Sequence, residues 1–525
     1  MRLTKTQTAY ALLIVCAAAR LLLQMAALPP YAGLDEVYHV ARLAFVRAEN
    51  RNPTTTEASI PPYLTASIEA ARSAGVPAGW PAGVPRLRPV DAGMPAMGEA
   101  GEKWPAIVAR GNVINDRPLT DADLQPYVVK NYEAQQTSLY YSLVAPIAPI
   151  RGALFELRIW RAMSLLFALI TVLATAEIGR RWLGPIGILG GAVLVSLPTW
   201  ETLVMRAGND AFACMLAAVA VLISVVAPKR FGIAVEAIIW GLALNAKMYT
   251  WPLLIILPIL WWRQRAPKVR MIAVTGVAVI AVLLTFVELH ARTRNPLGVV
   301  AFDRPGGVVY DAKVSISEIV RVTIASFAWT SGQFNDAMRP IAIALYLGPI
   351  LIAVLVSLRR QRAGGTPALP GLALAALGAF ALAQTYNVIA CVLARRGGND
   401  IPIGGKEGWY WYVLAPVLVP ALLAPALARW RIAAWWIVIW DVVITEGALF
   451  HDFAGMTSPA HGSMLFRWGP LRAPFTADLA NIGAGPLAAW TTAIRIVQLL
   501  AFFGLESFLQ RLRRNDRNID IARAG

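Results

Sequence analysis

The chain has 525 residues, 57% of them hydrophobic, and a formal net charge of +17, with a mean hydropathy of +0.55. Soluble proteins are about 45–50% apolar, so this composition excludes an ordinary soluble domain and indicates that most of the chain faces lipid. The basic residues stand in short clusters between long apolar runs. That pattern sets membrane topology and argues against nucleic-acid binding.

Long apolar runs predict the membrane-spanning elements. A bilayer core about 30 Å thick takes roughly 20 apolar residues as a helix, and runs without alternating polar positions favour helices over a barrel. We therefore predict an all-α polytopic bundle of about 12 transmembrane helices (roughly 11 to 13) in a single domain over residues 1–525. The expected spans are 7–28, 154–178, 184–204, 210–228, 231–245, 248–262, 271–290, 340–358, 370–393, 409–428, 432–450 and 487–509. The two short runs around Asn245 are alternatively one kinked helix.

The basic clusters orient these spans. With a cytoplasmic N-terminus, nearly all strong Lys and Arg clusters lie inside, as the positive-inside rule requires. The same topology places four loops outside, at 29–153, 291–339, 394–408 and 451–486. The first is the largest, and we expect its apolar end, 138–150, to form an interfacial helix or a re-entrant segment.

The first polar cluster follows the first span directly. It contains Asp35, Glu36, Tyr38, His39 and Arg42. If the segment is helical from Asp35, then Asp35, His39 and Arg42 share one face. A carboxylate there can accept a proton from an attacking hydroxyl, and a neighbouring cation can hold it or a phosphate in place. The alternative is that Asp35 only caps the helix.

Further polar clusters lie at the same predicted outer side. Their candidate site residues are Gln136, Tyr140, Tyr141, Arg206, Asn209, Asp210, Lys247, Arg395, Arg396, Lys406, Trp409 and Tyr410. The tyrosine pair is alternatively an aromatic belt, and Lys247 a snorkelling side chain. Arg395 and Arg396 violate the charge rule locally, and arginine suits bidentate phosphate recognition.

In this order the clusters resemble the membrane glycosyltransferases of the GT-C class, particularly bacterial relatives of the protein mannosyltransferases and the aminoarabinose transferase. That family places an Asp-Glu pair with a nearby His after the first helix, matched here by Asp35, Glu36 and His39. Its first loop ends in His-Pro-Pro-Leu-Tyr-Tyr, where residues 136–141 read Gln-Thr-Ser-Leu-Tyr-Tyr. The family's late Gly-Arg-Tyr is matched by residues 408–410, but its Arg is Trp409 here.

The resemblance implies a sugar donor carried on a polyprenyl phosphate, among membrane lipids, at the outer face of a bacterial inner membrane. A hydroxyl of a glycan, lipid or protein acceptor attacks the anomeric carbon with inversion, and the lipid phosphate leaves. Asp35 is implied as the general base. Cations would steady the leaving phosphate, and the implied ones are Arg42, Arg206, Lys247, Arg395, Arg396 and Lys406. The implied substrate-lining residues are Tyr38, Gln136, Tyr140, Tyr141, Asn209, Asp210, Trp409 and Tyr410.

The role of Glu36 and His39 stays open in the sequence. They either orient Asp35 or, together with it, bind a divalent cation such as Mg or Mn.

Two other classes of protein also compete with the glycosyltransferase. A transporter or lipid flippase would place ionisable groups near span centres, where Asp441 is its best residue. A polysaccharide polymerase or ligase with a lipid-linked donor would share the outward Arg and His chemistry, but we expect it to lack the early Asp-Glu pair.

Overall fold

The computed structural model describes residues 4–27, 35–54, 57, 59–60, 103, 105–106, 113–114, 117–118, 129–131, 136–151, 153–226, 230–293, 324, 340–363, 368–396, 408–423, 426, 432–442 and 485–524. Most of the predicted loops 29–153, 291–339 and 451–486 lies outside these residues, and so does Lys406.

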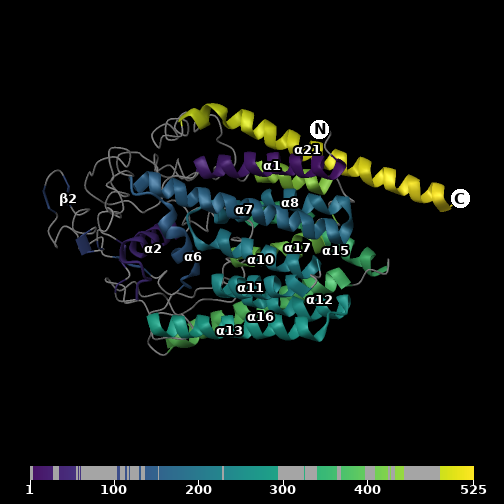
Figure 1. The fold of residues 1–525 in the computed structure, drawn as a ribbon. Helices are drawn as coiled ribbons and strands as arrows, with labels where there is room; N and C mark the ends of the chain where they lie inside the picture. Colours follow the sequence, from purple (N-terminus) through teal and green to yellow (C-terminus); the bar gives the residue numbers. More distant parts are fainter. Residues whose placement is uncertain are drawn as a thin grey trace.

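Long helices lie side by side and form the body of the molecule (Figure 1). They are α1 (Lys5–Ala27), α7 (Ala153–Leu183), α10 (Asn209–Val226), α11 (Arg230–Ala246), α13 (Lys268–Thr293), α15 (Pro340–Ala363), α16 (Ala368–Arg396) and α21 (Gly485–Ala524). Shorter α-helices are α2 (Glu36–Glu49), α6 (Leu139–Val144), α8 (Leu189–Val195), α9 (Pro198–Val204), α12 (Ile256–Gln264) and α17 (Ala415–Leu418). The 3₁₀ segments are η3 (Ala145–Ile147), η4 (Pro185–Ile188), η5 (Met248–Ile255) and η6 (Gly408–Leu414), and η7 (Val419–Leu423) is π-helical.

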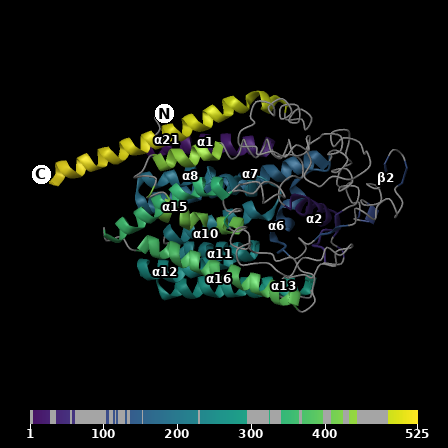
Figure 2. The same cartoon turned by 180° about the vertical axis from the view of Figure 1, so that it is seen from behind.

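Very little of the described chain is β structure. Within it, two antiparallel pairs of two-residue strands form: β1 (Ser59–Ile60) with β4 (Val129–Lys130), and β2 (Val113–Ile114) with β3 (Arg117–Pro118). In both views the two chain termini lie at one end of the bundle, whereas α2, α6 and β2 lie at the other (Figures 1 and 2). We call this second end the loop end.

Five described helices are long and apolar enough to cross a membrane, judged by length and composition: Lys5–Met25, Phe155–Leu183, Asn209–Val226, Lys268–Thr293 and Ala493–Arg513. Shorter apolar helices are Pro185–Val195, Gly232–Ala246, Met248–Trp262, Ile343–Val356, Gly371–Tyr386, Tyr410–Leu423 and Ile432–Val442. The predicted all-α, multi-pass membrane bundle is therefore confirmed for the described residues. The number of spans stays a prediction.

Element boundaries differ from the prediction in three places. The expected span 184–204 is broken at Ser196 and Leu197, because Pro198 has no N–H and disfavours a helical residue before it. The basic segment 511–517 follows the last expected span, 487–509, and is one of the clusters expected inside; in the structure its backbone continues α21. Arg395 and Arg396, expected in an outer loop, are the last two residues of α16.

A break after α11 presents Lys247 at the loop end. Lys247 is extended, with φ −164° and ψ 138°, so α11 and η5 are separate elements and not one kinked helix. The carbonyls that the break exposes need partners because lipid offers none. Thr250 donates to Ala243 at 2.8 Å and Trp251 to Leu244 at 2.8 Å. Side chains therefore replace the lost helical hydrogen bonds.

A buried ion pair joins the two ends of the chain within the bundle. Arg20 on α1 donates to both carboxylate oxygens of Asp441, at 3.0 and 3.1 Å, and both side chains are fully buried. Gln498 on α21 donates to the same carboxylate at 3.2 Å. Asp441, the residue that best suited a transporter, therefore holds three helices together.

We expect Asp441→Asn to destabilise the protein by about 3–5 kcal/mol, because removing one member of a buried pair exposes the other charge to a low dielectric. Thermal unfolding in detergent measures this as a lower midpoint. Glu57→Gln is the control. The Glu57 and Arg51 side chains form an ion pair and are 37% and 50% exposed, respectively, and an exposed pair of this kind is worth at most about 1 kcal/mol. Equal midpoints for the two variants would contradict the assignment.

Candidate active site

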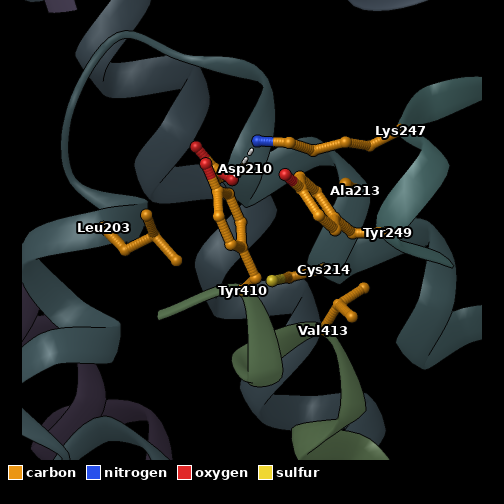
Figure 3. A pocket seen from close by; sticks show the side chains of 8 residues that line it. All are labelled: Leu203, Asp210, Ala213, Cys214, Lys247, Tyr249, Tyr410 and Val413. Atoms are coloured by element: carbon orange, nitrogen blue, oxygen red, sulfur yellow. Dashed lines mark hydrogen bonds and ion pairs between the residues drawn. The ribbon is translucent and has the colours of Figure 1, made fainter. Parts of the chain in front are cut away.

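A small recess opens at the loop end of the bundle, with a cavity volume of about 10 Å³, close to the space that one water molecule needs. Its lining comes from α9, α10, the segment 247–249 and η6, which are far apart in the sequence (Figure 3). The lining residues are Leu203, Asp210, Ala213, Cys214, Lys247, Tyr249, Tyr410 and Val413. Polar groups therefore share one small space with apolar ones that continue into the bundle.

The charged group of the recess is an ion cluster around Asp210. Lys247 Nζ donates to Asp210 Oδ1 at 2.5 Å and to Asn209 Oδ1 at 3.1 Å. Arg206 donates to the other carboxylate oxygen of Asp210. Asp210 lies in the first turn of α10, where the helix dipole favours an anion. Two cations and one carboxylate leave this trio cationic. Lys247 is only 5% exposed, so it does not snorkel.

Two stacked tyrosines form an aromatic wall of the recess. The rings of Tyr249 and Tyr410 have centroids 3.9 Å apart and an interplanar angle of 19°. Lys247 Nζ lies 5.6 Å from the Tyr249 centroid and 5.9 Å from that of Tyr410, which is within cation–π range. The wall and the ammonium group therefore face the same space, which suits a ligand with both a charge and a flat or apolar surface.

The turn between α9 and α10, residues 205–208, is held by the buried carboxylate of Glu36. Arg161 on α7 donates to Glu36 Oε1 at 2.8 Å and to Oε2 at 2.6 Å, and the Ala207 N–H donates to Oε1 at 2.8 Å. Ser164 on α7 donates to the Arg206 carbonyl at 2.8 Å. Glu36 therefore fixes the turn that carries Arg206 relative to α2 and α7.

Asp35 occupies the residue before α2 in a strained conformation. Its φ of 58° and ψ of 7° are left-handed, and its side chain makes no capping hydrogen bond. Its carbonyl accepts the N–H groups of Tyr38 at 3.0 Å and His39 at 3.1 Å. Asp35 therefore stands at the N-cap position of α2, as the alternative expected, but its side chain does not cap the helix with a hydrogen bond. Left-handed aspartate is uncommon and recurs at functional sites.

His39 is buried on the inner face of α2. Its Nδ1 shares a hydrogen bond of 2.7 Å with the Tyr141 hydroxyl. Burial, and then the nearby Arg206, Lys247 and Arg42 cations, hold the pKa of His39 well below its usual range, although Asp210 opposes them. Its ring is therefore neutral at physiological pH.

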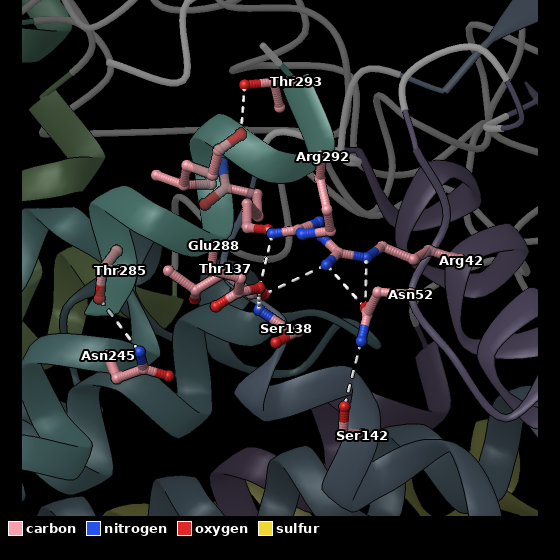
Figure 4. Close-up of polar contacts among 12 residues, drawn as sticks. Arg42, Asn52, Thr137, Ser138, Ser142, Asn245, Thr285, Glu288, Arg292 and Thr293 are labelled. Carbon is pink, nitrogen blue, oxygen red and sulfur yellow. Dashed lines mark hydrogen bonds and ion pairs between the residues drawn. The ribbon is translucent and has the colours of Figure 1, made fainter. Parts of the chain in front are cut away.

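The end of the first loop is fastened to three helices. Arg42 donates to the carbonyls of Gln136 at 3.0 Å and Thr137 at 3.3 Å, and its guanidinium lies 3.7 Å from the Tyr141 ring centroid. Arg292 on α13 donates to the same Gln136 carbonyl at 2.6 Å, and Figure 4 shows Arg292 close to Arg42. Thr137 donates to the Ala246 carbonyl at 2.8 Å, one residue before Lys247. In this structure Arg42 therefore binds the backbone of the first loop.

The tyrosines of this segment face the protein interior. Tyr140 and Tyr141 are fully buried, with ring centroids 5.1 Å apart and an edge-on geometry. Tyr140 also contacts Phe212 of α10, at 5.9 Å between centroids. The alternative of a lipid-facing aromatic belt is therefore wrong for this pair.

The residues expected to hold a divalent cation have other partners. Both oxygens of Glu36 accept hydrogen bonds from Arg161, and His39 Nδ1 pairs with Tyr141. Across the described part of the chain, no group of three or more His, Cys, Asp or Glu side chains is arranged to hold a metal ion. Asp35, Glu36 and His39 do not fit a shared ligand set in this arrangement.

The structure brings together most of the sequence-predicted site residues. Asp210, Lys247 and Tyr410 line the recess, and Asn209 joins it to the loop segment through a 3.5 Å contact with the Gln136 side chain. Tyr38 is half-buried, and its carbonyl accepts from Asn131. The backbones of Arg395, Arg396 and Trp409 are helical, but their side chains lie outside the described residues, as does all of Lys406.

Sequence reasoning missed three kinds of site residue. Arg161 stands inside the predicted span 154–178, and an arginine within a span is itself a mark of function. Tyr249 follows Lys247 by two residues but shows its role only when Tyr410 stacks on it. The lining residues Leu203, Cys214 and Val413 are ordinary apolar residues of their helices, and nothing in the sequence separates them from their neighbours.

Fold and site together define a multi-pass membrane protein with a cationic, aromatic recess at one end of its helical bundle. The fold is similar to that of two solved structures of ArnT from Cupriavidus metallidurans. One, bound to undecaprenyl phosphate, is 12% identical, with a TM-score of 0.38 over 90% of this chain and 74% of that one. The other, in the apo state, is 13% identical, with a TM-score of 0.36 over 89% and 74%. No family model matches the sequence, and no curated protein matches it significantly.

We expect Glu36→Gln to lower the thermal unfolding midpoint strongly, because a buried Arg161 then faces a neutral amide, a change worth about 3–5 kcal/mol. The double variant Glu36→Gln with Arg161→Gln should recover part of this loss, since no uncompensated charge remains. Glu49→Gln, on the same helix but only half-buried, is the matched control. A double variant no more stable than Glu36→Gln alone would argue against the pair as the tie between α2 and α7.

Proposed function

We propose that this protein transfers a sugar from a polyprenyl-phosphate donor to an acceptor hydroxyl at the extracytoplasmic face of a bacterial inner membrane. The observation that carries the proposal is the recess itself. A cation, tyrosine side chains and an apolar floor meet there at the loop end of a membrane bundle. A lipid phosphate needs this combination, since its charge seeks cations and its chain seeks an apolar surface.

The donor would lie with its phosphate near Lys247 and Arg206. Arginine and lysine both bind phosphate oxygens, and buried cations stabilise the charge that grows on a leaving group. Leu203, Ala213 and Val413 supply the apolar floor for the first part of the lipid chain. The Tyr249 and Tyr410 rings offer a flat surface beside it.

Asp35 is the proposed general base. The acceptor oxygen forms a bond to the anomeric carbon while the bond from that carbon to the phosphate oxygen breaks. The proton of the acceptor passes to the Asp35 carboxylate, and the electron pair leaves with the polyprenyl phosphate. A single displacement of this kind inverts the anomeric configuration. The left-handed backbone of Asp35 and the Glu36 tie support this role, because they fix Asp35 one residue from Glu36, whose carboxylate accepts the Ala207 N–H of the turn that carries Arg206.

The acceptor is a glycan, a lipid or a protein with an accessible hydroxyl, and the proposal commits to none of these. A polymerase or ligase with a lipid-linked donor would use the same recess. Product analysis separates the two, because a polymerase extends its product repeatedly whereas a transferase adds one sugar per acceptor site. The transporter hypothesis loses its best residue, since Asp441 pairs with Arg20.

We expect Asp35→Asn to lower kcat by about 10²- to 10⁴-fold, the usual contribution of a general base. Asparagine has the same shape and tolerates the left-handed conformation, so the fold should persist. The measurement is transfer of radiolabelled sugar from a panel of polyprenyl-phosphate sugars in membranes that contain each variant. Glu49→Gln serves as the control on the same helix.

Wild-type transfer should continue in the presence of EDTA, because the partners of Glu36 and His39 occupy the groups a metal would need. Unchanged activity of a folded Asp35→Asn variant would remove Asp35 as the base. Loss of activity in EDTA that Mg or Mn restores would reinstate a metal centre.

Lys247→Met should raise the KM for the donor and lower kcat/KM by about ten- to a hundredfold, the usual loss of one charge-assisted hydrogen bond. Lys268→Met, an exposed lysine at the other end of the bundle, should leave both constants unchanged. Because Lys247 also pairs with Asp210, the unfolding midpoint of each variant is measured alongside. A stable Lys247→Met protein with wild-type kinetics would show that the phosphate binds elsewhere.

A further inference from the structure

The His39 ring lies between two parts of the site. On one side it stacks on Tyr141, with 6.0 Å between ring centroids, an interplanar angle of 26° and the 2.7 Å hydrogen bond to the hydroxyl. On the other side it touches Gly208 so closely that a Cβ there would lie 2.9 Å from His39 Cδ2 and 3.2 Å from Nε2. Real Cβ atoms essentially never come within 3.0 Å of another side chain, so no residue larger than glycine fits at 208 without a shift.

Tyr141 cannot readily yield from the other side. Its ring is fully buried, with the Arg42 guanidinium 3.7 Å from its centroid and Tyr140 edge-on at 5.1 Å. Arg42 is itself fixed by Asn52, which accepts from it at 2.8 Å. Interiors packed in this way transmit a displacement and do not absorb it. The size of the His39 ring therefore sets how near the turn 205–208 comes to α6.

His39 is connected to both ends of the proposed reaction, to one through its backbone and to the other through its ring. The backbone N–H of His39 donates to the Asp35 carbonyl at 3.1 Å, so His39 belongs to the first turn after the proposed base. Gly208 stands between Arg206 and Asp210, the ion pair beside Lys247. A shift at the contact between His39 and Gly208 would therefore move the base relative to the phosphate site.

We infer that His39 is a positioning residue whose ring, wedged between Tyr141 and Gly208, sets the distance between the Asp35 helix start and the Arg206–Asp210 turn. This inference rests on the proposed function for its catalytic consequence, but the contact itself can be tested without it. It assigns His39 a steric and hydrogen-bonding role in place of a metal-ligand or proton-transfer role. It also requires glycine at position 208.

Charge supports the same role. Arg206, Lys247 and Arg42 surround the ring as cations, with Asp210 opposing them, and burial together with these cations lowers the pKa of His39. The folded protein therefore keeps the ring neutral while the unfolded chain binds a proton below about pH 6.5. Stability should fall as the pH drops through that value, by at most about a tenfold change in the unfolding equilibrium constant per pH unit from this group. A His39→Asn variant should lose that part of the slope.

The first test is a double-mutant cycle on the contact. Gly208→Ala should lower kcat/KM by about tenfold or more, since a small misplacement of catalytic groups is costly, and should also lower the unfolding midpoint. His39→Ala removes the ring, so adding it to Gly208→Ala should restore at least about twofold of the lost activity, and part of the lost stability. Gly276→Ala is the matched control, because a Cβ at Gly276 meets nothing within 4 Å.

The second test separates position from chemistry. Asparagine places an amide atom near the Nδ1 position and another near Cδ2, but nothing at Nε2. His39→Asn should therefore keep kcat within about threefold of wild type, with an unchanged pH profile, while His39→Ala should lose about tenfold or more. A metal ligand or proton-transfer group would not be rescued in this way.

Two results would overturn the inference. One is additive behaviour of Gly208→Ala and His39→Ala in both stability and activity, which would mean that the contact carries no coupling. The other is an inactive but folded His39→Asn with an altered pH profile or metal requirement. If wild-type protein transfers no sugar from any donor, the proposed function fails, but the stability cycle still decides whether His39 and Gly208 set the turn.

Discussion

The site depends above all on one buried carboxylate. Glu36 lies on the loop helix α2, and its partner Arg161 lies on the membrane helix α7. The Glu36 carboxylate also accepts a hydrogen bond from the Ala207 N–H, which is in the turn before α10. Three elements meet at that group, and a charge buried at 0% exposure tolerates no loose fit because its desolvation must be offset by well-placed donors. The contacts of Glu36 therefore also fix the position of Asp35, the preceding residue in the chain.

The membrane environment explains why so many side chains bond to the backbone around the site. Helix ends in a bundle cannot rely on water for their free carbonyls. Thr250 and Trp251 therefore bond to the end of α11, and Thr137 bonds to Ala246 from the first loop. These hydrogen bonds give partners to the carbonyls at the end of α11 and hold Lys247 extended beside Asp210. The same polar atoms thus complete a helix end and build one wall of the recess.

Charges within the bundle have different roles. Arg20 with Asp441, and Arg270 with Glu236, are buried pairs between helices, away from the recess, and they join segments distant in the sequence. Arg206, Lys247 and Asp210 line or border an open space. Burial alone does not separate the two groups, since all are less than a tenth exposed. The two groups differ in their position relative to the recess.

The sequence by itself determined the membrane class, the helical architecture and the segments that carry the site, because the length and polarity of apolar runs are local properties that lipid selects directly. It named Asp210, Lys247 and Tyr410 as candidates, but it could not show that they line one space. Only the tertiary structure decided that Glu36 binds Arg161, that Arg42 holds the loop backbone, and that His39 rests on Gly208. Those partners lie about 90 to 170 residues apart, so they depend on which elements pack together, and a local pattern does not encode that.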